Sequence, residues 1–443
     1  MSKSKDYAWM TKNKLMLYTF IALVVLAGVS AISWWPTSII ISIIAVVIAV
    51  ALDYGLSKIM KEKSPVNTLS AAVFGLIVAL SYTLGEPKSL VNNVLALTAP
   101  EAYYYVIVIT VIGVVVLKKA QSLMGRKYVN PAAAAKLLVL FPFLHSILLA
   151  KDHFTSSFGG YGLPSLASPI GYGDPTSFAG YVQSCLANAV TNSPQEVFYT
   201  LFIQKNHGWV GGASSLAVII VGVALFVVCR NYIKWRITVT YLAAITVMAV
   251  LMNFAYGGDL ALRLMFELFI GSSIFLAFFM ATDPATTPLT YVGQIIFGVG
   301  LAVLTVLIQT YMNFLGGSIL ALVIMNLTTP LLDNTGLRRP HAETTHPKLP
   351  KAQQFETANP VGCIRCGKCL ASCCHNLSPI LIKESHDKRN VKKLRRLQPD
   401  LCTGCGNCSF VCPSRIDLKL SVLKAKASLR PQPAEKINSD SGK

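Results

Sequence analysis

Cysteine spacing is the strongest chemical signal in this sequence. Nine of the 11 cysteines lie after residue 360, and eight of these nine form two runs of identical spacing. The runs are Cys363-Ile-Arg-Cys366-Gly-Lys-Cys369-Leu-Ala-Ser-Cys373 and Cys402-Thr-Gly-Cys405-Gly-Asn-Cys408-Ser-Phe-Val-Cys412-Pro413. Both read C-x2-C-x2-C-x3-C, a spacing at which thiolates hold [4Fe–4S] clusters. The sequence therefore predicts two such clusters.

The doubled run also predicts which thiols share a cluster. In two-cluster ferredoxins the fourth cysteine of each run binds the cluster of the other run. The predicted ligands are Cys363, Cys366, Cys369 and Cys412 for the first cluster, and Cys373, Cys402, Cys405 and Cys408 for the second. Zinc is the alternative because C-x2-C pairs also bind Zn²⁺, but the third and fourth cysteines at fixed spacing disfavour it. Cys374 stands where a proline normally follows the fourth cysteine, so it competes with Cys373, which the spacing favours.

The segment that carries these cysteines is basic. From Arg338 onward there are 20 Lys and Arg against 8 Asp and Glu. Six of the cations are concentrated in residues 388–396 between the two runs, at Lys388, Arg389, Lys392, Lys393, Arg395 and Arg396. Such a surface attracts a soluble acidic redox partner such as ferredoxin, or anionic lipid. A plain solvated basic face is the alternative.

The rest of the chain must position this chemistry, and its composition is that of a membrane protein. The chain has 443 residues, of which 53% are hydrophobic and 13% charged, with a net charge of +19. Soluble domains carry about 25% charged residues. The basic residues form no single groove-sized block, which argues against nucleic acid as a partner. Ten apolar stretches approach or reach the length that crosses a bilayer: 15–34, 36–53, 67–84, 102–118, 132–150, 215–231, 237–254, 260–281, 289–310 and 314–332.

Alternate loops between these stretches are basic, which predicts an orientation. Lys and Arg gather before the first stretch and in the second, fourth and sixth gaps, and the opposite gaps are nearly free of them. By the positive-inside rule, both termini and the cysteine segment face the cytoplasm. We therefore expect a multi-pass protein of the inner, cytoplasmic membrane, in which the long stretch 151–214 lies outside.

These patterns define the expected architecture. The fold class is an all-α polytopic membrane protein of about ten transmembrane helices with a small C-terminal α+β ferredoxin-like domain. The expected segments are a basic N-terminus 1–14, a membrane domain 15–333, a polar, Pro-containing linker 334–360, a two-cluster domain 361–430 and a tail 431–443. Charges inside spans are costly and often functional. Arg263 and Glu267 lie four residues apart on one helical face, so they either neutralise each other or line an ion path.

Two motifs in the apolar part resemble those of a known family. The stretch from Phe279 to Thr290 (FMATDPATTPLT), with Gly293-Gln294 and Phe297-Gly298 after it, resembles a signature of the D subunit of Rnf complexes. The B subunit of the sodium-pumping NADH:quinone reductase shares that signature. Shorter similarities lie at Asn130-Pro131-Ala132-Ala133, Leu201-Phe202-Ile203, Gly211-Gly212-Ala213-Ser214-Ser215, Met325-Asn326 and Pro330-Leu331. The resemblance covers residues 15–335, and the cysteine runs resemble the ferredoxin segment of the Rnf C subunit.

The resemblance implies flavin chemistry. Members carry FMN on a threonine, within a Ser-Gly-Ala-Thr type motif that this sequence lacks. The nearest candidate is Thr176, in the outside loop. We predict instead a non-covalent flavin, FMN or riboflavin, with Thr282, Asp283, Thr286 and Thr287 as its candidate binding region.

The resemblance also implies a function. We expect an electron-transferring subunit of an Rnf-like, ion-translocating, ferredoxin- or NAD(H)-linked oxidoreductase that works with other membrane and peripheral subunits and is not active alone. The first rival is a membrane-anchored ferredoxin-type relay without ion pumping, for example to a quinone-like carrier. The second rival is a transporter with a redox-sensing tail.

Overall fold

The computed structural model describes residues 10–60, 68–82, 100–123, 126–140, 202–203, 209–256, 260–269, 273–311, 317–341 and 362–429. The chain divides into two compact units. The helical unit is Asn13–Gly336, and the cysteine unit combines Leu337–Lys443 with Met1–Lys12. Most of the expected loop 151–214, the tail 431–443 and most of the linker 334–360 lie outside the described residues.

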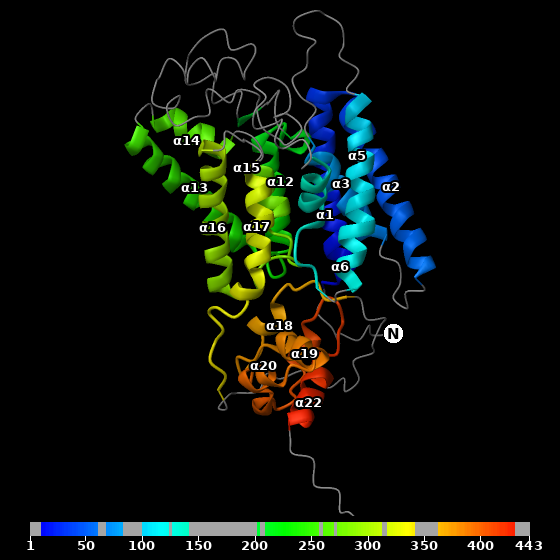
Figure 1. Cartoon of the computed structure of the whole chain (residues 1–443), viewed down its shortest axis with the longest axis vertical. Coiled ribbons are helices and arrows are strands. Elements are labelled where there is room, and N and C mark those ends of the chain that lie inside the picture. Colours follow the sequence, from blue (N-terminus) through cyan, green and yellow to red (C-terminus); the bar gives the residue numbers. More distant parts are fainter. Residues whose placement is uncertain are drawn as a thin grey trace, which may run out of the picture. The chain divides into compact units, whose positions relative to one another are not determined.

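The described part of the helical unit is mostly helical (Figure 1). Its elements are α1 (Lys12–Trp34), α2 (Thr37–Ile59), α3 (Thr68–Leu80), α5 (Pro100–Ile112), η1 (Gly113–Lys119), α6 (Ala120–Leu123), α7 (Pro131–Leu140), η3 (Val210–Gly212), α12 (Ser215–Val228), α13 (Trp235–Tyr256), α14 (Leu260–Phe269), α15 (Ser273–Phe275), η4 (Leu276–Met280), α16 (Tyr291–Tyr311) and α17 (Gly317–Leu332). Both η1 and η4 are π-helical, a form common near functional sites.

Four of these helices are long and apolar enough to cross a membrane, namely Lys12–Ile32, Thr37–Ile59, Trp235–Ala255 and Tyr291–Gln309. A fifth span results if the pair Arg263–Phe269 and Ser273–Met280, which is bent by 52°, counts as one. Three apolar helices are shorter: Thr68–Leu80, Ser215–Val228 and Gly317–Leu332. The mostly helical class is confirmed for the described residues, whereas the number of ten spans stays a prediction.

Small residues allow close packing inside the helical unit. A Cβ built on Gly75 of α3 would lie 2.6 Å from the Ala45 carbonyl oxygen of α2. A Cβ on Gly298 of α16 would lie 2.0 Å from the hydroxyl of Thr240 on α13. Packing of this kind holds membrane helices together, because lipid provides no hydrophobic drive for helix association. The outer faces are apolar instead: Ile43 is 57% exposed and Phe254 84% exposed.

The cysteine unit is small and helical in its described residues. Its elements are α18 (Lys368–Ala371), α19 (Pro379–Asp387), α20 (Val391–Arg396), η5 (Pro399–Leu401), α21 (Asn407–Phe410) and α22 (Leu418–Leu429). Leu381, Leu394 and Val422 are among its buried apolar side chains. Residues 362–429 contain no β-strand, so the expected α+β class is not confirmed there.

Candidate functional site

The two cysteine runs fold as two copies of one structure. Equivalent residues are 39 positions apart, so that Cys363 matches Cys402 and Cys373 matches Cys412. Each run has a glycine with φ near +80° after its second cysteine, Gly367 at 77° and Gly406 at 83°. Such a backbone conformation favours glycine because it has no Cβ. A short helix follows each glycine, α18 in the first copy and α21 in the second.

The first cavity is lined by residues of both copies. Four cysteines line it, three from the first run and one from the second: Cys363, Cys366, Cys369 and Cys412. The backbone N–H of Arg365 donates to the sulfur of Cys363 over 3.3 Å. Ile364, Ile380 and Leu418 add apolar walls.

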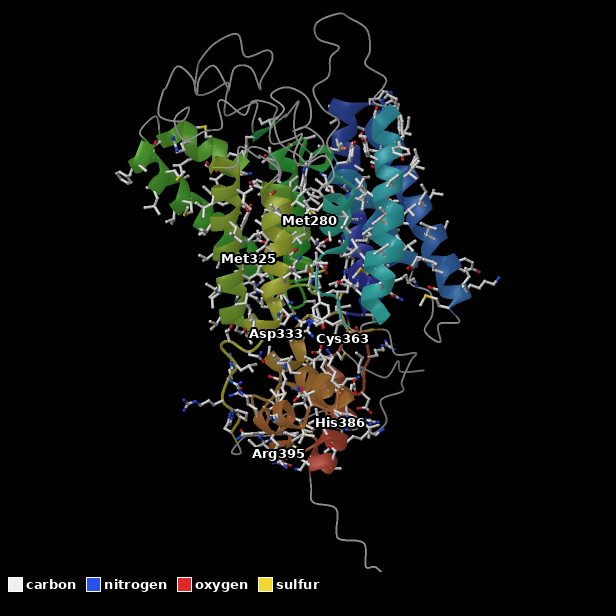
Figure 2. All side chains as sticks on the ribbon, viewed as in Figure 1. Met280, Met325, Asp333, Cys363, His386 and Arg395 are labelled. Carbon is white, nitrogen blue, oxygen red and sulfur yellow. The ribbon has the colours of Figure 1, made fainter. Side chains whose placement is uncertain are left out.

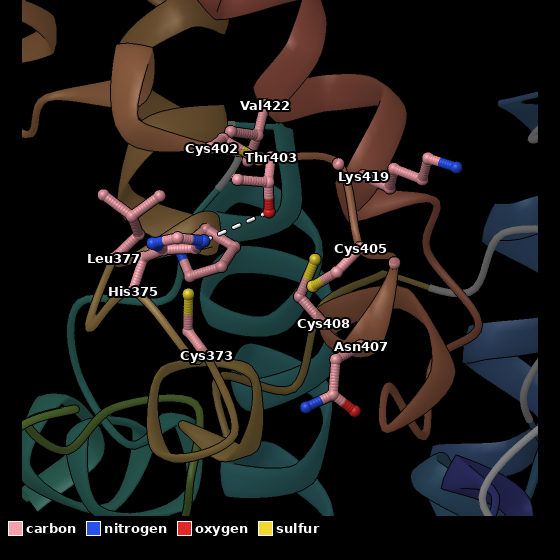
Figure 3. Close-up of a pocket in the computed structure, with 13 residues that line it drawn as sticks. Cys373, His375, Leu377, Cys402, Thr403, Cys405, Asn407, Cys408, Lys419 and Val422 are labelled. Carbon is pink, nitrogen blue, oxygen red and sulfur yellow. Dashed lines mark hydrogen bonds between the residues drawn. The ribbon is translucent and has the colours of Figure 1, made fainter. Parts of the chain in front are cut away.

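The second cavity is likewise lined by residues of both copies (Figure 3). Its sulfur-bearing walls are Cys373, Cys402, Cys405 and Cys408, and Leu377 and Val422 contribute apolar surface. Figure 3 shows the sulfurs of Cys373, Cys405 and Cys408 directed into the same space. The structure thus gathers the predicted thiols in two sets of four, and each set takes one thiol from the opposite run.

This arrangement fits a group larger than one metal ion. Among the described residues, no three His, Cys, Asp or Glu side chains converge on a position that suits a single ion. Four thiols around a cavity, with small glycines beside them, are the donor set of a [4Fe–4S] cluster. The assignment of individual ligands stays a prediction.

Burial by the protein alone favours the protonated form of two of these thiols, Cys369 and Cys408. Desolvation raises the pKa of Cys408 to about 12, and the neighbouring Cys402, Cys373 and Cys405 contribute to this rise. Burial also raises the pKa of Cys369. Because iron binds thiolates, the thiols must release their protons when a cluster binds. The free energy of iron binding then offsets the cost of holding charged thiolates in a buried site.

Cys374, the competing ligand, occupies a different place from Cys373. Cys373 lines the second cavity, and Cys374 is not among the lining residues. The sulfur of Cys374 lies 3.8 Å from the sulfur of Cys405.

His375, which no sequence pattern singles out, also lines the second cavity. The side chain is 2% exposed. Its Nδ1 is 2.9 Å from the carbonyl oxygen of His341, and its Nε2 is 3.1 Å from the hydroxyl of Thr403. Figure 3 shows the second contact as a dashed line. In the sequence this histidine is marked only by its place directly after Cys373 and Cys374, and that spacing indicates no role for it.

The basic cluster between the runs forms α20 and the turn before it. Asn390 caps this helix by accepting the N–H of Lys393 over 3.0 Å. Leu394 is buried on the inner side, whereas Lys388, Arg389, Lys392, Arg395 and Arg396 are exposed. Three successive turn bonds (Gln398 N to Arg395 O, Leu401 N to Gln398 O, Cys402 N to Pro399 O) connect α20 directly to Cys402. An exposed cationic surface therefore begins close to the second cavity along the chain.

The predicted flavin region forms a compact turn in the helical unit. Thr282 donates to the Phe278 carbonyl over 2.6 Å, and Thr287 donates to the Asp283 carbonyl over 2.7 Å. The Asp283 carboxylate accepts the hydroxyl of Thr286 at 3.3 Å. All three threonines are nearly fully buried. The structure brings the four residues together, and their polar groups bond within the turn; their role toward a flavin stays a prediction.

Two charged residues that sequence analysis did not select fix this turn. Lys234 donates to the carbonyl oxygens of Pro284 and Thr287, both at 2.8 Å. Asp333 accepts the N–H of Leu289 at 2.9 Å and pairs with Arg126 at 2.9 Å. Both are nearly fully buried, and Asp333 is labelled in Figure 2. Each lies at the edge of an apolar stretch, where a sequence pattern indicates only a loop charge.

The turn also connects to the Asn130-Pro131 motif. The side-chain oxygen of Asn130 accepts the N–H groups of Ala132 at 3.0 Å and Ala133 at 3.3 Å, which caps α7. The amide nitrogen of the same side chain donates to the Met280 carbonyl at 3.3 Å. Two motifs that are 150 residues apart in sequence thus meet at the end of η4.

The remaining candidates have separate positions. Arg263 and Glu267 both lie on α14 and are 2% and 3% exposed; their part in an ion path stays a prediction. Thr176 lies outside the described residues.

Comparisons with known proteins divide the chain in the same way. Residues 7–341 match the NQR2, RnfD, RnfE family, and residues 362–416 match a 4Fe-4S dicluster domain.

Curated relatives share the first of these two parts. The D subunit of the Na(+)-translocating ferredoxin:NAD(+) oxidoreductase complex of Acetobacterium woodii is 26% identical over 309 residues, which are 70% of this chain and 84% of that protein. The D subunit of the proton-translocating ferredoxin:NAD(+) oxidoreductase complex of Clostridium ljungdahlii is 24% identical over 328 residues, or 72% and 89%. The B subunit of the Na(+)-translocating NADH-quinone reductase of Stutzerimonas stutzeri is 27% identical over 226 residues, or 50% and 52%.

The apolar helices and these membrane-complex relatives identify a multi-pass membrane protein, and the dicluster match supports iron–sulfur clusters in the cysteine unit. Because the first match covers most of the chain, this protein belongs to the NQR2, RnfD, RnfE family and carries a 4Fe-4S dicluster domain behind the family part.

Proposed function

We propose that this chain is an electron-transferring subunit of an Rnf-like, ion-translocating membrane oxidoreductase. In this role the cysteine unit passes electrons between a soluble acidic carrier, such as ferredoxin, and a non-covalent flavin or a partner subunit in the membrane. The carrying observation is the pair of four-thiol cavities on a chain whose larger part belongs to this family. A [4Fe–4S] cluster supplies one-electron transfer when it is bound.

The residues of the chain have distinct tasks in this proposal. The eight thiols in the two cavities hold the clusters, and the crossed thiols Cys373 and Cys412 keep the two cavities in one small unit. The exposed cations of α20 attract the acidic carrier. The turn around Asp283, which Lys234 and Asp333 fix, provides a rigid support beside the membrane cofactor.

The named relatives belong to ion-translocating complexes, which supports a coupling of electron transfer to ion movement in this chain as well. Coupling requires that electron arrival favours one of two conformations of a membrane element. The bent pair α14 and α15–η4 is a candidate element, because it carries the buried Arg263 and Glu267 and ends in the turn at Thr282.

Anaerobic purification of the full chain with its complex tests the proposal. We expect about eight iron and eight acid-labile sulfide per chain, together with flavin that denaturation releases. Zinc without sulfide would refute the cluster assignment. A fluorescent band in a denaturing gel that disappears in Thr176→Ala would refute the non-covalent flavin.

Vesicles containing the complex separate the proposal from its rival without pumping. We expect electron transfer from reduced ferredoxin to NAD⁺ to drive ion uptake, and a Cys405→Ser variant to lose both. Electron transfer without any ion uptake would favour a simple membrane-anchored relay.

A further inference from the structure

The second cavity has a fifth thiol beside it, and the first cavity has none at the matching position. The two copies of the cysteine fold align Cys374 with Pro413, directly after the crossed cysteines Cys373 and Cys412. The backbone follows the same path in both copies, because Asn376 and Arg415, two residues further on, both have φ near +50°, at 53° and 52°. The copies therefore differ at this position in chemistry and not in fold.

The Cys374 sulfur lies 3.8 Å from the sulfur of Cys405, within the range of a hydrogen bond between sulfur atoms. A cysteine that binds no metal is a thiol at neutral pH, since its ordinary pKa is about 8.5. Cys405 is a thiolate when it binds iron, so it can only accept. The hydrogen bond then has one direction, from the Cys374 S–H to the Cys405 sulfur. Pro413 has neither a side-chain donor nor an N–H.

We propose that the Cys374 thiol donates a hydrogen bond to the cluster ligand Cys405 and thereby raises the reduction potential of the second cluster. This inference rests on the proposed iron–sulfur function. Reduction adds one negative charge to the cluster and its ligand sulfurs, so a donor at a ligand sulfur stabilises the reduced state more than the oxidised state. Hydrogen bonds to sulfur are among the factors that set cluster potentials.

The consequence is an asymmetry between two otherwise similar sites. An electron shared by the two clusters resides more in the second one than it would without the donor. The second cavity is also the one that α20 adjoins along the chain. In this proposal Cys374 is not a cluster ligand; it acts through Cys405 and determines which of the two clusters holds the electron.

The test is a redox titration of the full chain, purified without oxygen, followed by electron paramagnetic resonance. Cys366→Ser and Cys405→Ser assign the two cluster signals. We expect Cys374→Ala to keep about eight iron per chain and to lower the potential of the second cluster only. Cys374→Ser, which restores a donor hydrogen on oxygen, should return that potential toward the wild-type value. Cys229→Ala, which removes a buried cysteine of the helical unit, should change neither potential.

Several results would overturn the inference. An unchanged potential in Cys374→Ala, or an equal shift of both clusters, would remove the proposed hydrogen bond. Loss of half the iron in Cys374→Ala would show that Cys374 is a ligand. A wild-type chain without iron and sulfide would instead refute the proposed function on which the inference rests.

Discussion

At the scale of single residues, the second cysteine of each run is one of the four thiols that line its cavity. Cys366 lines the first cavity and Cys405 the second. Serine at either position replaces a soft thiolate with a hydroxyl that binds iron weakly. We expect Cys366→Ser and Cys405→Ser each to abolish or strongly alter one cluster signal in electron paramagnetic resonance and to leave the other. Loss of both signals in both variants would show that the cavities do not load independently.

The turn around Asp283 receives hydrogen bonds from the buried cation Lys234. In Lys234→Met the carbonyl oxygens of Pro284 and Thr287 lose a donor while they stay buried. An unsatisfied buried group costs about 1–3 kcal/mol, so we expect a lower melting temperature in detergent, measured by differential scanning fluorimetry. Arg230→Met, an exposed cation four residues earlier, is the control and should have little effect. Equal melting temperatures for both variants would contradict this account.

Residue-level prediction from the sequence was most specific where spacing alone determines chemistry, although the role of each thiol as a ligand stays a prediction. The doubled C-x2-C-x2-C-x3-C run places the eight thiols in the two groups that the cavities contain. Lys234, Asp333 and His375 were not predicted, because their partners are backbone groups or residues far along the chain. No local pattern encodes such a contact.

At the scale of elements, α20 is a short helix with a buried leucine on one side and exposed cations on the other. We expect Arg395→Glu, at a position labelled in Figure 2, to slow association with a small acidic ferredoxin. The reason is that opposite charges steer the encounter and salt screens them. Stopped-flow rates at several ionic strengths measure this effect, which should shrink as salt rises.

Lys424→Glu on α22 is the matched control, since it makes the same charge change on an exposed residue of another helix. An equal slowing in both variants would mean that net charge, and not α20, determines association. Faster binding of Arg395→Glu would contradict a docking role. Lost binding to anionic vesicles, with unchanged ferredoxin association, would identify lipid as the occupant.

Helix prediction was most accurate where apolar stretches are long. The stretches 15–34, 36–53, 237–254 and 289–310 correspond to α1, α2, α13 and α16. The stretch 260–281 is bent into α14 and α15–η4, and 102–118 changes from α5 into π-helical η1. Hydropathy reports the length of an apolar run, but it contains no information on breaks within the run.

At the scale of the whole molecule, the Lys and Arg asymmetry predicts which side of the membrane each segment faces. We expect an impermeant maleimide to label Thr176→Cys from outside the cell, and a tag after Lys443 to be accessible only from the cytoplasm. A background without the other exposed cysteines provides the control. Labelling of Thr176→Cys from the cytoplasmic face alone would reverse the topology.

The crossing of Cys373 and Cys412 between the two cavities has a consequence for how this domain can be divided. A fragment that ends before Pro399 keeps five cysteines, but only three of them face the first cavity, and the fragment with Cys402 is short of a thiol in the same way. Neither half is a self-sufficient ferredoxin. Each copy supplies one thiol to the cavity of the other copy. We therefore expect the two copies to be gained, lost or transferred between proteins together.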